Sequence, residues 1–323
     1  MGGRPALTIR SYGVSLTIAG DAGLIREVAG GLRTSFAGRY IPTFEVLGGE
    51  AAAGGAPKAS VEWVRGRSFR VVDYVLRDSG VDEYVIESPP PAPYVNESPY
   101  FFILQALSRL YVRAGLLMLT DAVSVADPRL ESAALLLGYP HTGKSTLLAL
   151  ALASGLKPLT TENTLLKVDG GVARVVGGTG VLVYDPRVRE EYGVNVPASG
   201  MTRHGYAVVD LRGVVGGRDG ALGRGVPVKA IYLLYTSFSS RGADLKPVKG
   251  RKVVKTLWHF ATAVVRGTDY YDPLPPPLTS PGVDEAIASR VKALAGAYGG
   301  RMFEAFGSHP KVLEVVAGAL REA

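Results

Sequence analysis

One segment, residues 133–146, constrains the fold more than any other part of the chain. It reads AALLLGYPHTGKST, an apolar run followed by a glycine-bounded loop, and leucine- and alanine-rich sequence continues after it. Residues 138–145 fit the pattern G-x-x-x-x-G-K-[ST], which cradles phosphate groups when it joins a strand to a helix. The apolar run ends at Leu137, and a helix is expected from Lys144. The segment therefore predicts an α/β domain with a nucleotide-binding loop.

Each fixed position of this loop has a physical reason. Gly138 and Gly143 allow backbone N–H groups to turn toward phosphate oxygens, an approach that a Cβ would obstruct. Lys144 would reach the β- and γ-phosphates, and the Ser145 hydroxyl would bind Mg²⁺. The predicted nucleotide-binding residues are Gly138, Tyr139, Pro140, His141, Thr142, Gly143, Lys144, Ser145 and Thr146. The predicted ligands are ATP and Mg²⁺.

A Mg²⁺ ion at this loop also needs a carboxylate, and several follow or precede predicted strands. Glu162 comes one short return after the helix that follows the loop, so we expect it at the same sheet edge, holding the metal together with Ser145. Asp121 lies just after an apolar strand upstream of the loop, and Asp185 and Asp210 lie at further strand ends. These three aspartates remain alternatives to Glu162.

A change of pattern along the chain predicts two domains. The first hundred residues alternate short strand-like runs with glycine-rich turns, and the proline-rich run 88–93 ends them. We therefore expect a small α+β domain at residues 1–95 and an α/β domain, with a mixed central sheet and flanking helices, at residues 96–323. The expected strands are 7–10, 14–19, 61–64, 69–76, 81–87, 116–119, 133–137, 165–168, 172–176, 181–184, 206–211 and 228–235. The expected helices are 22–33, 100–114, 147–154, 253–265, 283–297 and 311–320.

Composition excludes several classes of protein. The chain has no cysteine, which rules out disulfides, thiol nucleophiles and iron–sulfur clusters. No stretch approaches the roughly 18 apolar residues of a membrane-spanning helix, so we expect a soluble, cytoplasmic protein with no membrane partner. The net charge of +7 is spread along the chain without a Lys/Arg block, which disfavours a nucleic-acid partner. Asparagine, glutamine and cysteine are all scarce, a thermophile-like signature.

Three segments between about residues 115 and 270 together resemble one family with this type of loop. The first runs from the loop to LTTEN at 159–163, the second is VDLRGV at 209–214, and the third is PVKGRK at 247–252, before a predicted helix. In this order they are similar to the kinase domain of HPr kinase/phosphorylase and its PEPCK-like relatives. ABC ATPases and GTPases are disfavoured because LSGGQ-like and N-K-x-D motifs are absent.

The resemblance implies a P-loop kinase fold and transfer of the ATP γ-phosphoryl group to a hydroxyl, that of serine in particular. It implies that Lys144, with Arg212 or Arg251, neutralises charge, and that Asp121 or Glu162 accepts the hydroxyl proton or orients the nucleophile. Two adjacent aspartates of the family fall on Thr161 and Glu162, and a histidine of the family corresponds to Asp121. The donor site is thus retained and the acceptor site altered.

The altered acceptor site favours a small hydroxyl-bearing metabolite, free L-serine first, over a serine-bearing protein. The alternative is a nucleotide-binding regulator, or an ATPase, without acceptor activity; the Thr161 replacement favours it. The sequence leaves open the preferred nucleotide, pyrophosphate as a donor and assembly into a homo-oligomer.

Overall fold

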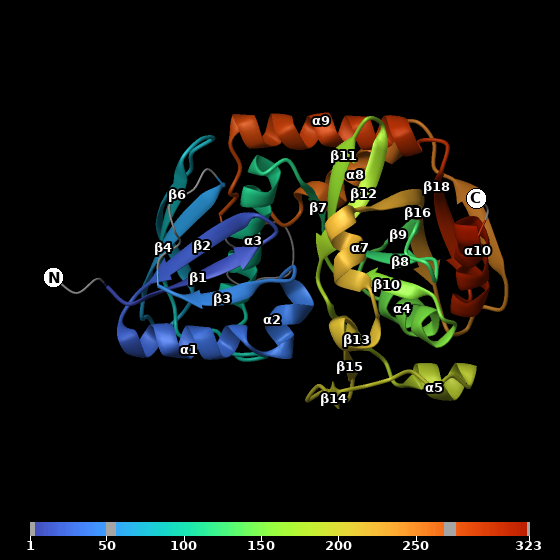
Figure 1. Cartoon of the computed structure of the whole chain (residues 1–323), viewed down its shortest axis with the longest axis horizontal. Coiled ribbons are helices and arrows are strands. Elements are labelled where there is room, and N and C mark those ends of the chain that lie inside the picture. Colours follow the sequence, from blue (N-terminus) through green and yellow to red (C-terminus); the bar gives the residue numbers. More distant parts are fainter. Residues whose placement is uncertain (1–3, 50–55, 268–275, 322–323) are drawn as a thin grey trace. The chain divides into compact units, whose positions relative to one another are not determined.

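The computed structural model describes residues 4–49, 56–267 and 276–321, as an α/β protein with mixed sheets and flanking helices (Figure 1). It divides into two compact units, Met1–Met118 with Ala261–Ser289 and Leu119–Phe260 with Arg290–Ala323. This division differs from the expected boundary after residue 95. Within the described residues, no helix combines the length and the hydrophobicity needed to cross a membrane.

The first unit is built on a sheet with the strand order β3-β1-β2-β4-β6-β5. Its central pairs β2–β4 and β4–β6 are parallel, and its outer pairs are antiparallel. The elements are β1 (Ala6–Ser11), β2 (Val14–Ala19), α1 (Ala22–Leu32), α2 (Ser35–Tyr40), β3 (Glu45–Gly48), β4 (Lys58–Val64), β5 (Arg70–Val75), β6 (Val81–Glu87) and α3 (Ser98–Arg113). Helix α1 begins after Asp21, whose side chain accepts a hydrogen bond from Leu24 N. The five strands and the helix expected before residue 88 are present; β3 and α2 carried no clear local pattern.

Helix α3 explains why the first unit extends past residue 95. Its aromatic side chains are buried, and Phe102 packs edge-on against Tyr84 of β6 with ring centroids 5.3 Å apart. Arg109, fully buried, donates to the Asp82 carboxylate of β6 at 3.0 Å and to Ser280 Oγ at 2.9 Å. An ion pair with so little solvent exposure holds its geometry well, because separating it would strand a buried charge. The helix and the segment around residue 280 therefore belong to the first unit.

The second unit contains the loop and is built on a larger mixed sheet, in the order β10-β8-β9-β16-β12-β11-β7, with β18 beside β16 and β17 beside β18. Its strands are part of β7 (Leu117–Leu119), and β8 (Ala122–Ala126), β9 (Ala133–Leu137), β10 (Lys157–Thr160), β11 (Thr164–Asp169), β12 (Val172–Gly178), β13 (Val181–Tyr184), β14 (Gly200–Met201), β15 (Ala207–Asp210), β16 (Val226–Thr236), β17 (Ala243–Pro247) and β18 (Met302–Gly307). Its helices are α4 (Lys144–Ala153), α5 (Arg187–Tyr192), α6 (Leu211–Val214), α7 (Arg218–Arg224), and parts of α8 (Arg251–Thr262) and α9 (Pro281–Tyr298), with α10 (His309–Arg321) closing the chain. Strands β13, β15 and β14 form a separate small sheet.

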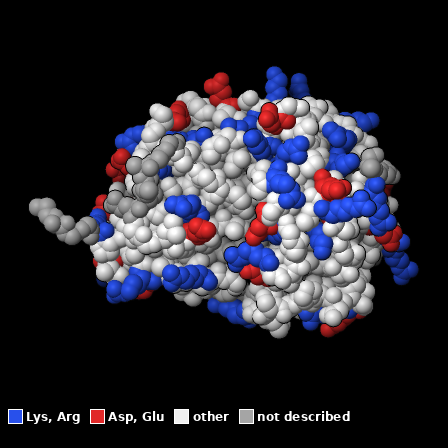
Figure 2. Space-filling view, viewed as in Figure 1, with Lys and Arg blue, Asp and Glu red and all other residues white. Residues whose placement is uncertain are grey.

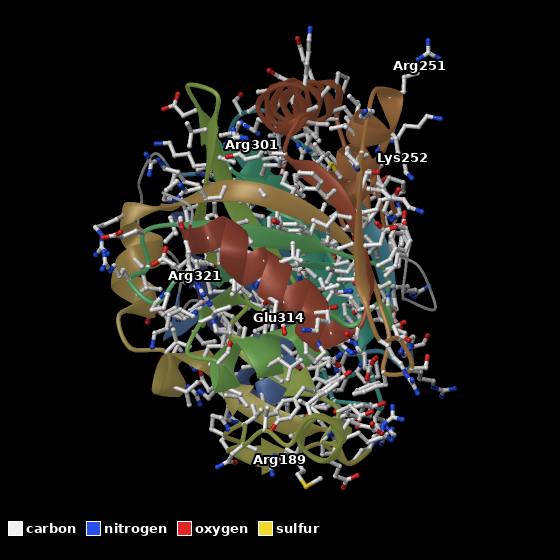
Figure 3. The ribbon with its side chains drawn as sticks, turned by 90° about the vertical axis from the view of Figure 1, so that its right-hand side faces the viewer. Arg189, Arg251, Lys252, Arg301, Glu314 and Arg321 are labelled. Atoms are coloured by element: carbon white, nitrogen blue, oxygen red, sulfur yellow. The ribbon has the colours of Figure 1, made fainter. Side chains whose placement is uncertain are left out.

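The core of this unit lies between the large sheet and the helices α4 and α10. Val123, Leu136 and Tyr232 from the sheet pack with Leu148 of α4 and Val316 of α10. Figure 3 shows α10 in front of the strands, with Glu314 and Arg321 along it. The predicted strand at 133–137 is confirmed, and the helix after the loop begins at Lys144, as the loop pattern predicts.

Charged side chains of both signs are interspersed on the face that Figure 2 shows. Figure 2 shows Lys and Arg side chains in separate groups with Asp and Glu among them, across the visible face. Many of the described charges are paired, for example Lys252 with Glu304 at 2.7 Å and Arg65 with Glu27 at 2.8 Å.

Candidate functional site

The loop between β9 and α4 has a backbone that only glycine can adopt at its second fixed position. Gly143 has φ +95°, and a Cβ there would lie 2.0 Å from Thr236 Oγ1. A Cβ on Gly138 would lie 2.2 Å from Thr142 Oγ1. Leu147 N donates to Gly143 O at 2.9 Å, which is the first hydrogen bond of the helix. The N–H groups of residues 144–146 come before this bond and therefore have no acceptor within the helix. They form the N-terminal end of α4, where an anion is stabilised.

The directions of the strands place the other candidate residues at the same edge of the sheet as the loop. Strand β16 runs parallel to β9, and β18 runs parallel to β16, so their carboxyl ends lie at the edge where β9 enters the loop. Strand β8 runs antiparallel to β9, which brings its amino end, after Asp121, to the same edge. Strand β10 is antiparallel to β8, so its carboxyl end, before Glu162, lies there too. Asp121, Glu162 and Thr236 thus share one edge although they are far apart in the sequence.

Lys144 is buried and paired in this structure. Its Nζ donates to Asp121 Oδ1 at 2.9 Å, to Tyr139 O at 3.1 Å and to Gly138 O. The side chains of Lys144 and Asp121 are only 7% and 5% exposed. Asp121 has φ +49°, and its carbonyl accepts from Gly138 N at 3.1 Å, so backbone and side chain both join it to the loop. An ammonium ion held beside a carboxylate at a phosphate loop can exchange that carboxylate for phosphate oxygens.

The Glu162 segment is fixed to the same edge by its backbone. Glu162 O accepts from Ala122 N at 2.9 Å, next to Asp121, and Glu162 N donates to Thr179 Oγ1 at 2.8 Å. Thr179 Oγ1 also accepts from Asn163 N at 3.1 Å and is fully buried. Glu162 therefore stands beside Asp121, and Ser145 occupies the first turn of α4. Thr161 is buried and donates to Thr179 Oγ1 at 3.0 Å.

Arg218 supports this segment and was not predicted. Its guanidinium is 1% exposed and donates from Nε to Leu159 O at 2.8 Å and from Nη2 to Thr179 O at 3.4 Å. These bonds hold the end of β10, which precedes Glu162. They also hold Thr179, whose hydroxyl accepts a hydrogen bond from Glu162 N. The signal in the sequence, an arginine after Gly216 and Gly217, looked like an exposed glycine-rich turn.

His309 is a second residue that sequence reasoning missed. It begins α10 at the carboxyl end of β18, is 2% exposed, and its Nε2 lies 2.5 Å from where a Cβ on Gly143 would be. Its Nδ1 lies 2.8 Å from Tyr192 Oη. Burial lowers the pKa of His309 to about 4, so the imidazole is neutral at pH 7.

Two predicted arginines are not brought to the loop by any contact seen in the described residues. Arg212, 54% exposed, pairs with Asp210 at 2.6 Å, and its hydrogen bonds lower the pKa of the Asp210 carboxyl. Arg251 begins α8 and projects outward next to Lys252 (Figure 3). The end of α8 that contacts the loop includes Phe260 and His259, whose ring centroid is 5.3 Å from that of Tyr139. Eight residues of helix separate His259 from Arg251, about 12 Å along the axis.

The remaining predicted positions follow the loop itself. Tyr139, Pro140 and His141 are exposed, His141 with φ +65°, while Thr146, in the first turn of α4, is buried. Thr142 O accepts from Thr236 Oγ1 at 2.7 Å, which fastens the loop to β16.

Two of the alternative metal-binding carboxylates have other partners. Asp185 pairs with Arg187 at 2.8 Å, and Asp210 caps the short helix α6. In the described part of the chain, no three His, Asp or Glu side chains cluster closely enough to form a metal site of their own. Mg²⁺ commonly takes only one or two protein carboxylates and completes its shell with phosphate oxygens and water. Ser145 with Glu162 or Asp121 fits that second arrangement.

The chemistry available at this edge is that of polyphosphate binding: a helix N-terminus, a buried ammonium group, a hydroxyl and two carboxylates. Comparison of the chain with models of known protein families and with curated proteins found no match.

Proposed function

We propose that the protein is an ATP- and Mg²⁺-dependent phosphotransferase of the P-loop kinase type, working in the cytoplasm. The acceptor is a hydroxyl group, of free L-serine or a similar small metabolite first and of a protein serine second. The observation that carries the proposal is the edge of the large sheet where the Gly138–Thr146 loop, Lys144 and Asp121 meet. The resemblance of three ordered segments to HPr kinase and its PEPCK-like relatives supports the same reaction.

The residues present fit both ATP and Mg²⁺. The loop offers an ammonium group and backbone amides to phosphate, and glycines where a side chain would collide with Thr236 or Thr142. Ser145 and Glu162 would hold Mg²⁺, which neutralises phosphate charge when bound. Backbone amides of residues 144–146 would carry the phosphates nearest the nucleoside, and Lys144 those at the far end.

The chain's own groups divide the chemical work as follows. Lys144 Nζ leaves Asp121 Oδ1 for the phosphate oxygens, which frees a carboxylate at the end of the loop where the γ-phosphate lies. Asp121 then accepts the proton of the acceptor hydroxyl. The hydroxyl oxygen bonds to the γ-phosphorus while the bond between that phosphorus and the ADP oxygen breaks. Glu162, beside Asp121, is the alternative base.

One observation favours a second candidate, a nucleotide-binding regulator or an ATPase without an acceptor. Arg212 is paired with Asp210, and Arg251 projects outward, so neither cation that the resemblance implies lies against the loop in this structure. A kinase that kept only Lys144 and Mg²⁺ would have less positive charge for the transition state.

Labelled ATP separates these candidates. The protein is incubated with Mg²⁺, γ-labelled ATP and a panel containing L-serine, serinol, sugars and cell extract, with Lys144→Met as the inactive variant and Lys252→Met as the control. Lys252 is 55% exposed and paired with Glu304. The proposal expects a labelled small molecule with wild type and the control, and none with Lys144→Met. Released phosphate alone indicates an ATPase, bound ATP without turnover indicates a regulator, and no ATP binding refutes the assignment of the loop.

A further inference from the structure

A cluster of aromatic side chains lies beside the loop on the side away from Asp121. Phe238 and Tyr192 are half-buried and stack with ring centroids 5.7 Å apart and an angle of 14°. The His309 ring lies 4.9 Å from that of Phe238 and 5.9 Å from that of Tyr192. The guanidinium of Arg187, 61% exposed, lies 4.9 Å from the Phe238 centroid. None of these residues has a role in the phosphate chemistry described above.

Two connections fix this cluster to the loop. His309 Nε2 lies against Gly143, and its Nδ1 is within 2.8 Å of Tyr192 Oη, so one imidazole spans loop and cluster. Thr236 donates to Thr142 O from both N and Oγ1, at 3.2 and 2.7 Å, and Phe238 follows only two residues later. The aromatic rings therefore lie close to the loop, and residues at the ends of two strands, β16 and β18, fix this separation.

The direction of Lys144 tells which end of a polyphosphate would face the cluster. In a loop of this type the lysine reaches the β- and γ-phosphates, whereas the amides of the helix N-terminus cradle the α- and β-phosphates. Here Nζ points to Asp121 and Tyr139, at the start of the loop. The α-phosphate, and the group bonded to it, would lie at the opposite end of the loop, where Gly143 is next to His309.

We infer that the Phe238–Tyr192 pair is a stacking surface for the base of a nucleotide, so that the phosphoryl donor is a nucleoside triphosphate rather than an inorganic polyphosphate. The inference rests on the proposed function and deepens it. A base stacks on an aromatic ring whatever its identity, and a guanidinium packs on the same kind of surface. Arg187 marks a face of Phe238 where a flat group already packs, and its exposed side chain can move aside or cover the base.

His309 acts in this arrangement as a positioning residue. Because it is neutral at pH 7, it adds no charge to the phosphates, and its contacts hold Tyr192 against Phe238 at a set distance from Gly143.

The test compares two ligands that share phosphates and differ in the nucleoside. Calorimetric titration with ATP and with inorganic tripolyphosphate, each with Mg²⁺, is carried out on the full chain. We expect wild type to bind ATP at least about tenfold more tightly than tripolyphosphate. Equal affinity for the two ligands would overturn the inference, and this comparison needs no variant. Failure to bind either ligand would overturn the proposed function as well.

Variants then locate the surface. Phe238→Leu keeps an apolar side chain without the ring and should weaken ATP about 10- to 100-fold while leaving tripolyphosphate within about twofold. Phe238→Tyr should restore ATP binding. Phe306→Leu is the matched control, because Phe306 likewise stacks on a tyrosine, Tyr235 of β16 (4.9 Å), and likewise lies beside a cation, Lys246 (5.2 Å). An equal loss for both ligands in Phe238→Leu would mean that the ring only supports the loop, and would refute base stacking.

Discussion

The buried pair of Lys144 and Asp121 makes a prediction that can be measured without any ligand. Their charged atoms are 2.9 Å apart, and both side chains are more than nine-tenths buried. Lys144→Met removes the cation and leaves the Asp121 carboxylate buried without its partner, which costs about 3–5 kcal/mol in comparable cases. Asp121→Asn is milder, about 1–2 kcal/mol, because two carbonyls and the new amide oxygen still accept from Nζ.

The double variant retains neither charge and should cost about as much as Asp121→Asn alone. A double-mutant cycle therefore gives a coupling energy equal to the cost of Lys144→Met alone, about 3–5 kcal/mol. The free energies come from urea unfolding followed by circular dichroism at neutral pH. Arg212→Met with Asp210→Asn is the control cycle, since that pair is 54% and 40% exposed and should couple by about 1 kcal/mol or less.

Equal coupling in the two cycles would refute the reasoning, because the loop pair would then behave as a solvated surface pair. Lys144 could in that case bind phosphate without first losing a strong interaction, and Asp121 would not stabilise the loop through its charge.

Three further predictions concern the loop, the metal and pH. Gly143→Ala should abolish measurable nucleotide binding in titration calorimetry, because its Cβ would overlap a β16 hydroxyl, whereas Gly205→Ala, with φ +80° and no neighbouring atom within 4 Å, should bind normally. Glu162→Gln should reduce Mg²⁺-dependent turnover about 100-fold or more, and Asp185→Asn should not; the reverse result would move the metal ligand to Asp185. The pKa of His309 is about 4 in the folded chain and about 6.5 unfolded, so the unfolded state binds the additional proton as pH falls from 6.5 to 4, and stability is lost over that window. By pH 5 this amounts to about 1–2 kcal/mol, and His309→Gln should lose correspondingly less stability between pH 7 and 5 in urea titrations; an unchanged pH slope would contradict it.

Local pattern alone predicted the elements whose causes are local. The loop of residues 138–145 follows from glycine spacing between an apolar strand and a helix, and the structure has that order. The turn between β11 and β12 follows from Gly170 and Gly171, both with positive φ, at +54° and +76°. The two units do not divide after residue 95, because the buried Arg109 joins α3 to Asp82 and to Ser280, 171 residues further along the chain, and no local pattern predicts that contact.

The candidate site divides in the same way. The sequence by itself determined the loop, its lysine and its serine, because a glycine-bounded turn between a strand and a helix is made by consecutive residues. Only the tertiary structure decided what stands around them: β8 and β10 bring Asp121 and Glu162 to the loop, and β16 and β18 bring Thr236 and His309. Pairing of distant strands decides which carboxylate and which ring reach a loop, and burial decides that Lys144 is paired and His309 neutral. Both depend on the packed sheet, which the spacing of residues along one chain does not specify.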